Sequence, residues 1–176
     1  LKNFKALQNA ELRDIPNFCV IVGANGTGKS TIFSLFGFLK DALTSNVNTA
    51  LARLGGSRGF EEVRSRGATG PIEIELKFRD SPSQPLTTYF LQLNQKDGRA
   101  FVEREILKYR RGSKGKPWNF LDFSDGKGRA VTNELDSVKM NRLYSEKIKY
   151  SNRAIFWLSR DLRSLNAFPL WLLWEI

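Results

Sequence analysis

Alternating apolar and polar residues in the second half of the chain predict an antiparallel sheet. Between residues 72 and 79, Ile, Leu and Phe alternate with Glu, Lys and Arg, which indicates a half-buried strand. Further strands are expected at residues 89–93, 101–109, 118–123 and 129–132. Asp97-Gly98 and Asp125-Gly126 are strong hairpin signals between consecutive strands. Short strands joined by tight turns pair in antiparallel fashion.

The first half of the chain mixes strand and helix patterns. Residues 2–8 predict a first strand, and the apolar run at 18–22 predicts a short buried strand. Apolar residues then recur at helical spacing, which predicts a helix over 28–43. Gly37 lies inside this helix, where Gly costs about 1 kcal/mol relative to Ala, so close packing is expected there.

A second, shorter helix is expected at residues 46–54. Its apolar face is followed by Gly55-Gly56, which is typical of a helix end. Residues 57–70 are rich in Gly, Ser and Arg and predict a surface loop.

The glycine-rich loop at residues 23–30 fits the phosphate-binding pattern G-x-x-x-x-G-K-[ST] between the expected strand and helix. Its glycines allow backbone amides to converge on phosphate oxygens at the positive end of the following helix. Lys29 would reach the β- and γ-phosphates, and the Ser30 hydroxyl would ligate Mg²⁺. The alternative is a strand-to-helix turn that binds nothing. The predicted nucleotide-binding residues are Gly23, Ala24, Asn25, Gly26, Thr27, Gly28, Lys29, Ser30 and Thr31.

Composition narrows the class of protein. The 176 residues include 28 Lys and Arg against 18 Asp and Glu, a net charge of +10 that favours polyanionic partners. There is no His, which excludes histidine-based acid–base or metal chemistry. The single cysteine, Cys19, suits a reducing cytosol, and the amino end does not resemble a signal peptide. The apolar run at 168–174 is far shorter than the ~20 residues of a membrane helix, so a cytoplasmic protein without a membrane segment is expected.

A basic stretch at residues 108–116 is a candidate nucleic-acid contact. A loop of this kind can follow a phosphate backbone, and a solvated hairpin loop is the equally weighted alternative. The candidate polyanion-binding residues are Arg110, Arg111, Lys114 and Lys116.

The loop string Gly-Ala-Asn-Gly-Thr-Gly-Lys-Ser-Thr resembles that of ABC-type ATPases, in particular the RecF and SMC branch. The chain is similar to bacterial AAA family ATPases with a RecF-like core. The matching strings lie at residues 1–5, 36–40, 71–75, 108–112, 120–123 and 132–134. The resemblance implies an α+β / α/β P-loop NTPase fold, with an amino-terminal lobe at residues 1–138 that carries an antiparallel β-subdomain. It also implies ATP and Mg²⁺ as cofactors, a second head of the same kind in a homodimer, and closure on DNA or another partner.

Residues 139–176 form an atypical tail that does not match this family's motifs, so the head domain is incomplete. Neither a signature motif nor a Walker B strand is recognised there, and Asp122, Asp125 and Asp161 do not follow an uninterrupted apolar strand. Residues 152–169 can be back-translated so that a neighbouring reading frame reproduces the family's expected continuation. We interpret the tail as out of frame or poorly ordered.

Three functions are compatible with these patterns. The first is ATP binding within a RecF/SMC-like ATPase, with binding but no turnover expected from this chain alone. The second is a non-catalytic nucleotide-binding fragment or a degenerate gene product. The third is a P-loop kinase, against which the β-rich half offers no evident acceptor site or lid.

Overall fold

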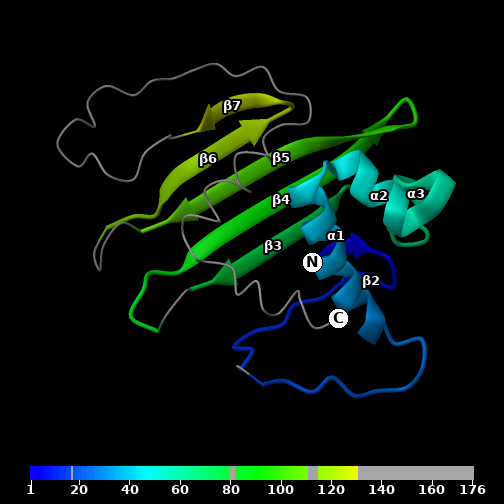
Figure 1. Cartoon of the computed structure of the whole chain (residues 1–176), viewed down its shortest axis with the longest axis horizontal. Helices are drawn as coiled ribbons and strands as arrows, with labels where there is room; N and C mark the ends of the chain where they lie inside the picture. Colours follow the sequence, from blue (N-terminus) through cyan, green and yellow to red (C-terminus); the bar gives the residue numbers. More distant parts are fainter. Residues whose placement is uncertain (17, 80–81, 111–114, 131–176) are drawn as a thin grey trace.

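A computed structural model describes residues 1–16, 18–79, 82–110 and 115–130, and Figure 1 shows their arrangement. Two short strands at the amino end are followed by helices and then by a run of strands. In chain order the elements are β1 (Lys2–Phe4), β2 (Leu7–Asn9), α1 (Lys29–Thr44), α2 (Val47–Gly55), the 3-10 turn η1 (Gly56–Arg58), α3 (Phe60–Val63), β3 (Ile72–Phe78), β4 (Thr87–Lys96), β5 (Arg99–Tyr109), β6 (Trp118–Ser124) and β7 (Lys127–Ala130).

The described strands form one sheet in the order β2-β1-β3-β4-β5-β6-β7, and every neighbouring pair is antiparallel. This confirms the antiparallel half that the alternation predicts. Residues at both predicted hairpin turns, Asp97-Gly98 and Asp125-Gly126, have positive φ, as tight two-residue hairpin turns require. The last strand, expected at 129–132, lies at Lys127–Ala130, while residues 131 and 132 fall outside the described part.

One face of the sheet packs against the helices to form the core. Ile74, Leu91 and Leu93 are fully buried, and Leu35, Phe38 and Leu39 of α1 belong to the same cluster. Figure 1 shows α1, α2 and α3 on the β1–β3–β4 side of the molecule, with β6 and β7 at the opposite side. The helical spacing in the sequence therefore predicts α1 correctly, to within one residue at each end.

The expected helix at 46–54 is confirmed as α2. Asn46 caps its first turn, because the Asn46 Oδ1 atom accepts a hydrogen bond from the Thr49 amide at 2.8 Å. Val47, Ala50 and Leu51 are buried on one face, as predicted.

The prediction of a single strand at residues 2–8 is wrong. The segment folds into a hairpin of β1 and β2, because Lys5 adopts a positive φ of 49° and reverses the chain. β1 then pairs with β3 through Lys2 and Glu73.

The predicted buried strand at residues 18–22 is also wrong. This segment, part of the blue trace at the bottom of Figure 1, is not in a strand. Phe18 is 82% exposed and Val22 is 84% exposed. An apolar run becomes a buried strand only where other strands pair with its backbone and other elements cover it. Among the described residues no strand pairs with this segment. The glycine-rich loop and helix α1 are therefore present without the strand that is expected before them.

Two further expectations fail for reasons of packing. Gly37 lies on the exposed side of α1, and no atom lies within 4 Å of the position that a Cβ would take. Residues 57–70 are not simply a surface loop, since Phe60 and Val63 of α3 insert into the core. Neither fact is visible in local composition, because each depends on how the helices meet the sheet.

Candidate functional site

The glycine-rich loop at residues 23–30 adopts a backbone that needs its glycines. Gly26 and Gly28 have φ values of 84° and 90°, in the left-handed region that L side chains rarely adopt. Helix α1 begins at Lys29, directly after Gly28, and runs for 16 residues. The loop therefore ends at the positive end of a helix, where backbone amides favour anions.

The Lys29 side chain folds back along the loop. Its ammonium group donates hydrogen bonds to the carbonyl oxygens of Gly23 and Ala24, at 2.7 and 2.5 Å. The Thr27 hydroxyl also donates to the Ala24 carbonyl, at 2.9 Å. These hydrogen bonds hold the positive charge of Lys29 beside the first two residues of the loop.

The backbone amides of residues 24–28 donate no hydrogen bond within the described part of the chain. The residues of this loop are exposed except Gly28 and Lys29. A run of exposed amides beside a lysine ammonium group is an arrangement that an anion can satisfy.

The loop rests on the turn between β1 and β2, an approach that the sequence reasoning missed. A Cβ built on Gly28 would lie 2.8 Å from Leu7 Cδ2 and 3.6 Å from the Ala6 Cβ. The Ser65 hydroxyl donates to the Leu7 carbonyl at 3.3 Å, which ties the turn to the chain after α3. Position 28 therefore requires glycine for two reasons, its positive φ and the close approach of Leu7. The sequence gives no local signal of this approach, because Leu7 and Gly28 lie far apart along the chain.

The predicted metal ligand Ser30 is exposed in the first turn of α1, and its carbonyl accepts a hydrogen bond from the Ser34 hydroxyl at 2.9 Å. The next residue, Thr31, is buried, so its side chain faces the core rather than the loop.

Within the described ranges, no group of three or more His, Cys, Asp or Glu residues could hold a metal ion. Asp122 and Asp125 lie in β6 and in the turn after it, where Asp122 pairs with Arg104 at 2.7 Å. Asp161 lies outside the described residues.

The candidate polyanion residues are only partly described. Arg110 and Lys116 are exposed, while Arg111 and Lys114 lie outside the described residues. Arg79, which the sequence did not single out, lines the same surface hollow as Arg110.

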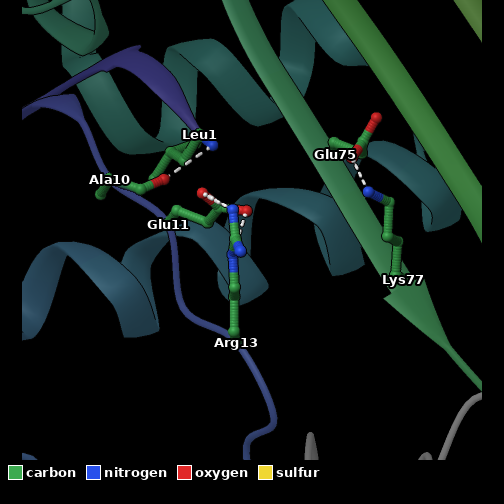
Figure 2. Close-up of polar contacts among 6 residues, drawn as sticks. All are labelled: Leu1, Ala10, Glu11, Arg13, Glu75 and Lys77. Atoms are coloured by element: carbon green, nitrogen blue, oxygen red, sulfur yellow. Dashed lines mark hydrogen bonds and ion pairs between the residues drawn. The ribbon is translucent and has the colours of Figure 1, made fainter.

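Figure 2 shows two ion pairs at the surface, one after β2 and one on β3. Arg13 Nε and Glu11 Oε1 are 2.8 Å apart, and Lys77 Nζ and Glu75 Oε1 are 2.7 Å apart. Hydrogen bonding to Arg13 lowers the pKa of Glu11, and hydrogen bonding to Glu75 raises the pKa of Lys77. The Leu1 amino group donates to the Ala10 carbonyl at 3.0 Å, which anchors the start of the same segment. Each ion pair thus joins residues two positions apart and satisfies its charges locally.

Glu105 is a buried acid in the middle of the core face of the sheet. It pairs with Leu91 of β4 and Phe123 of β6, and it is fully buried. The Tyr89 hydroxyl donates to Glu105 Oε1 at 3.0 Å, while Oε2 has no hydrogen-bond partner in the described part of the chain. Burial raises the pKa of Glu105 to about 7, and the hydrogen bond from Tyr89 opposes this rise.

Comparison with known families gives one result. A family model described as "AAA domain, putative AbiEii toxin, Type IV TA system" matches residues 18–169. The matched range includes the glycine-rich loop and α1, and it extends past Val138, further than the motifs in the sequence indicate. No curated protein and no solved structure matches the chain significantly. Of the helices that the structure describes, none combines the length and apolar character that crossing a membrane requires. The match covers most of the chain, so the protein belongs to this AAA-domain family of P-loop ATPases.

Proposed function

We propose that residues 23–31 bind ATP together with Mg²⁺, as the nucleotide-binding element of a RecF/SMC-like ATPase. The observation that carries the proposal is the conformation of the glycine-rich loop. Positive-φ glycines at 26 and 28 lead directly into a 16-residue helix, with Lys29 folded back along the loop.

The residues of the loop fit a nucleotide polyphosphate. The exposed residues 24–27 carry backbone amides that can donate to phosphate oxygens, at the end of α1 that favours negative charge. Lys29 would exchange the Gly23 and Ala24 carbonyl oxygens for phosphate oxygens, which form stronger, charge-assisted hydrogen bonds. The Ser30 hydroxyl, exposed at the start of α1, would contribute one ligand to the metal.

Binding without steady turnover is the behaviour proposed for this chain alone. Phosphoryl transfer needs an acid to help hold the metal and a group to orient the attacking water. The glycine-rich loop supplies neither, and in the RecF/SMC-like arrangement a second head completes the site. Turnover is therefore proposed to depend on an acid and a water-orienting group that the loop does not supply, and also on a further head in a homodimer.

The test is an equilibrium titration of fluorescent ATP with Mg²⁺ into the wild-type chain and the Lys29→Ala variant. Removing the ammonium group should weaken binding by about one to two orders of magnitude, because hydrogen bonds to charged groups contribute roughly 1.5–3 kcal/mol. The matched control is Lys96→Ala, which removes the same charge from the exposed end of β4 and should bind like the wild type.

Circular dichroism should show that both variants remain folded, since Lys29 and Lys96 lie outside the buried core. Equal affinity of the wild type and the folded Lys29→Ala variant would mean that ATP binds elsewhere or not at all.

A further inference from the structure

Basic residues gather on the outer face of the sheet, at the end where the β3–β4 and β5–β6 connections lie. The strand register places Lys77 of β3 opposite Thr88 of β4, and Thr88 opposite Lys108 of β5. Their neighbours Leu76, Tyr89 and Leu107 belong to the core. Because side chains alternate along a strand, Lys77, Thr88 and Lys108 form a row on the opposite, outward face.

Two arginines continue this row beyond the strand ends. Arg79 follows Lys77 by two residues, Arg110 follows Lys108 by two residues, and both are exposed. They line one hollow of about 420 Å³, which we call the Arg79–Arg110 hollow. Its other walls include Gln84, Thr88 and Pro117. Two arginines from distant parts of the sequence thus line the same depression.

The positive charge of this hollow is little neutralised. Arg79 donates a long hydrogen bond of 3.4 Å to the Pro82 carbonyl. Within the described residues, no ion pair is formed by Arg79, Arg110 or Lys108. Of the nearest acids along these strands, Glu75 pairs with Lys77 and so neutralises one cation of the row, while Asp122 pairs with Arg104, each at 2.7 Å. In the sequence, residues 79–86 and 110–117 together contain five basic residues and one acid, Asp80.

We propose that the Arg79–Arg110 hollow binds the phosphate backbone of a nucleic acid. A guanidinium group donates two parallel hydrogen bonds to a phosphate, which makes arginine pairs suited to this ligand. The cations are spread over two strands, β3 and β5, and the connections that follow them, rather than focused on one point. A chain that carries several phosphates therefore complements them better than a single free phosphate.

The test is fluorescence anisotropy of a labelled single-stranded oligodeoxythymidine, titrated with the full chain at several salt concentrations. In the Arg79→Ala/Arg110→Ala variant, affinity should fall about tenfold or more. The slope of log affinity against log salt should become shallower by about 0.7 for each phosphate that the variant no longer neutralises. Both side chains are exposed, so the variant should fold like the wild type.

The matched control is Lys96→Ala/Arg99→Ala, which removes two positive charges at the opposite end of the β4–β5 hairpin. Equal reductions of affinity in both variants would mean that only net charge attracts the oligonucleotide, and would overturn the site. An Arg79→Lys/Arg110→Lys variant should keep most of the salt dependence and bind with part of the wild-type affinity.

Inorganic phosphate at constant ionic strength should not displace the oligonucleotide. Displacement would show that the hollow takes free phosphate, which contradicts the proposal. The Lys29→Ala variant should bind the oligonucleotide like the wild type, so this test is independent of the nucleotide proposed at residues 23–31.

Discussion

Leu91 in the middle of β4 is fully buried, whereas Val22, directly before the glycine-rich loop, is 84% exposed. Both residues belong to strongly apolar stretches. β4 finds its partners β3 and β5 through nearby chain reversals, and its inner face meets the helices. Residues 18–22 have no such neighbours among the described strands. An apolar stretch is therefore buried only when other elements supply partners for both its backbone and its side chains.

The largest expected effect is the difference between two leucine truncations. Leu91→Ala should lower the free energy of unfolding by about 2–5 kcal/mol, because it removes buried apolar atoms and leaves a cavity. Leu12→Ala, in the segment that leads to the glycine-rich loop, should change it by less than about 0.5 kcal/mol, since Leu12 is 57% exposed. Urea unfolding followed by circular dichroism measures both. A cost for Leu12→Ala as large as that for Leu91→Ala would show that this segment is part of the core.

The next effect is a pH dependence of stability that arises from Glu105 in the sheet region. The pKa of Glu105 rises from its ordinary 4.5 to about 7 in the folded chain, because burial disfavours the carboxylate. The protonated group therefore stabilises the fold fully below pH 4.5, and this stabilisation disappears as pH rises through about 7. At about 1.4 kcal/mol for each pH unit, the decrease is about 3 kcal/mol.

Glu105→Gln removes the titrating carboxyl while keeping its shape. The difference in unfolding free energy between variant and wild type should therefore shift in favour of the variant as pH rises through this window. Urea unfolding at a series of pH values checks it. A difference that stays constant from pH 4.5 to 7 would mean that burial does not perturb the Glu105 carboxyl.

The strands β3 to β6 could be predicted from the sequence, whereas the β1–β2 hairpin and the surroundings of the glycine-rich loop could not. Alternation and the Asp-Gly turns are local signals, and they locate β3 to β6 closely. The hairpin at Lys5, the exposure of residues 18–22 and the approach of Gly28 to Leu7 depend on how distant parts of the chain meet. Glu105 lies two residues before Leu107 in β5, so the two side chains share the buried face of the strand. A glutamate gives no apolar signal in the sequence, so its burial could not be predicted.

A smaller effect concerns two glycines of the loop. Gly28→Ala should cost about 1–3 kcal/mol, because an L residue is strained at a φ of 90° and its Cβ would meet Leu7. Gly26→Ala has a similar φ but no atom near its Cβ, so its cost should be smaller. Thermal unfolding of the two variants compares them. Equal costs would show that the turn of β1 and β2 does not support the loop.

The smallest effect is a gain in stability at Gly37. Because this residue lies on the exposed side of α1 with free space around it, Gly37→Ala should raise the free energy of unfolding by up to about 1 kcal/mol. The same unfolding assay measures the gain. A decrease in stability would indicate that this side of α1 packs against something.

The most direct test of the nucleotide proposal is hydrogen exchange at the backbone amides of residues 24–28, with and without ATP and Mg²⁺. These amides have no acceptor in the described part of the chain, so they should exchange fast alone. Bound phosphate should slow them strongly in the wild type and in Lys96→Ala, and much less in Lys29→Ala. If ATP and Mg²⁺ leave the exchange of these amides unchanged in the wild type, the glycine-rich loop is not the nucleotide site.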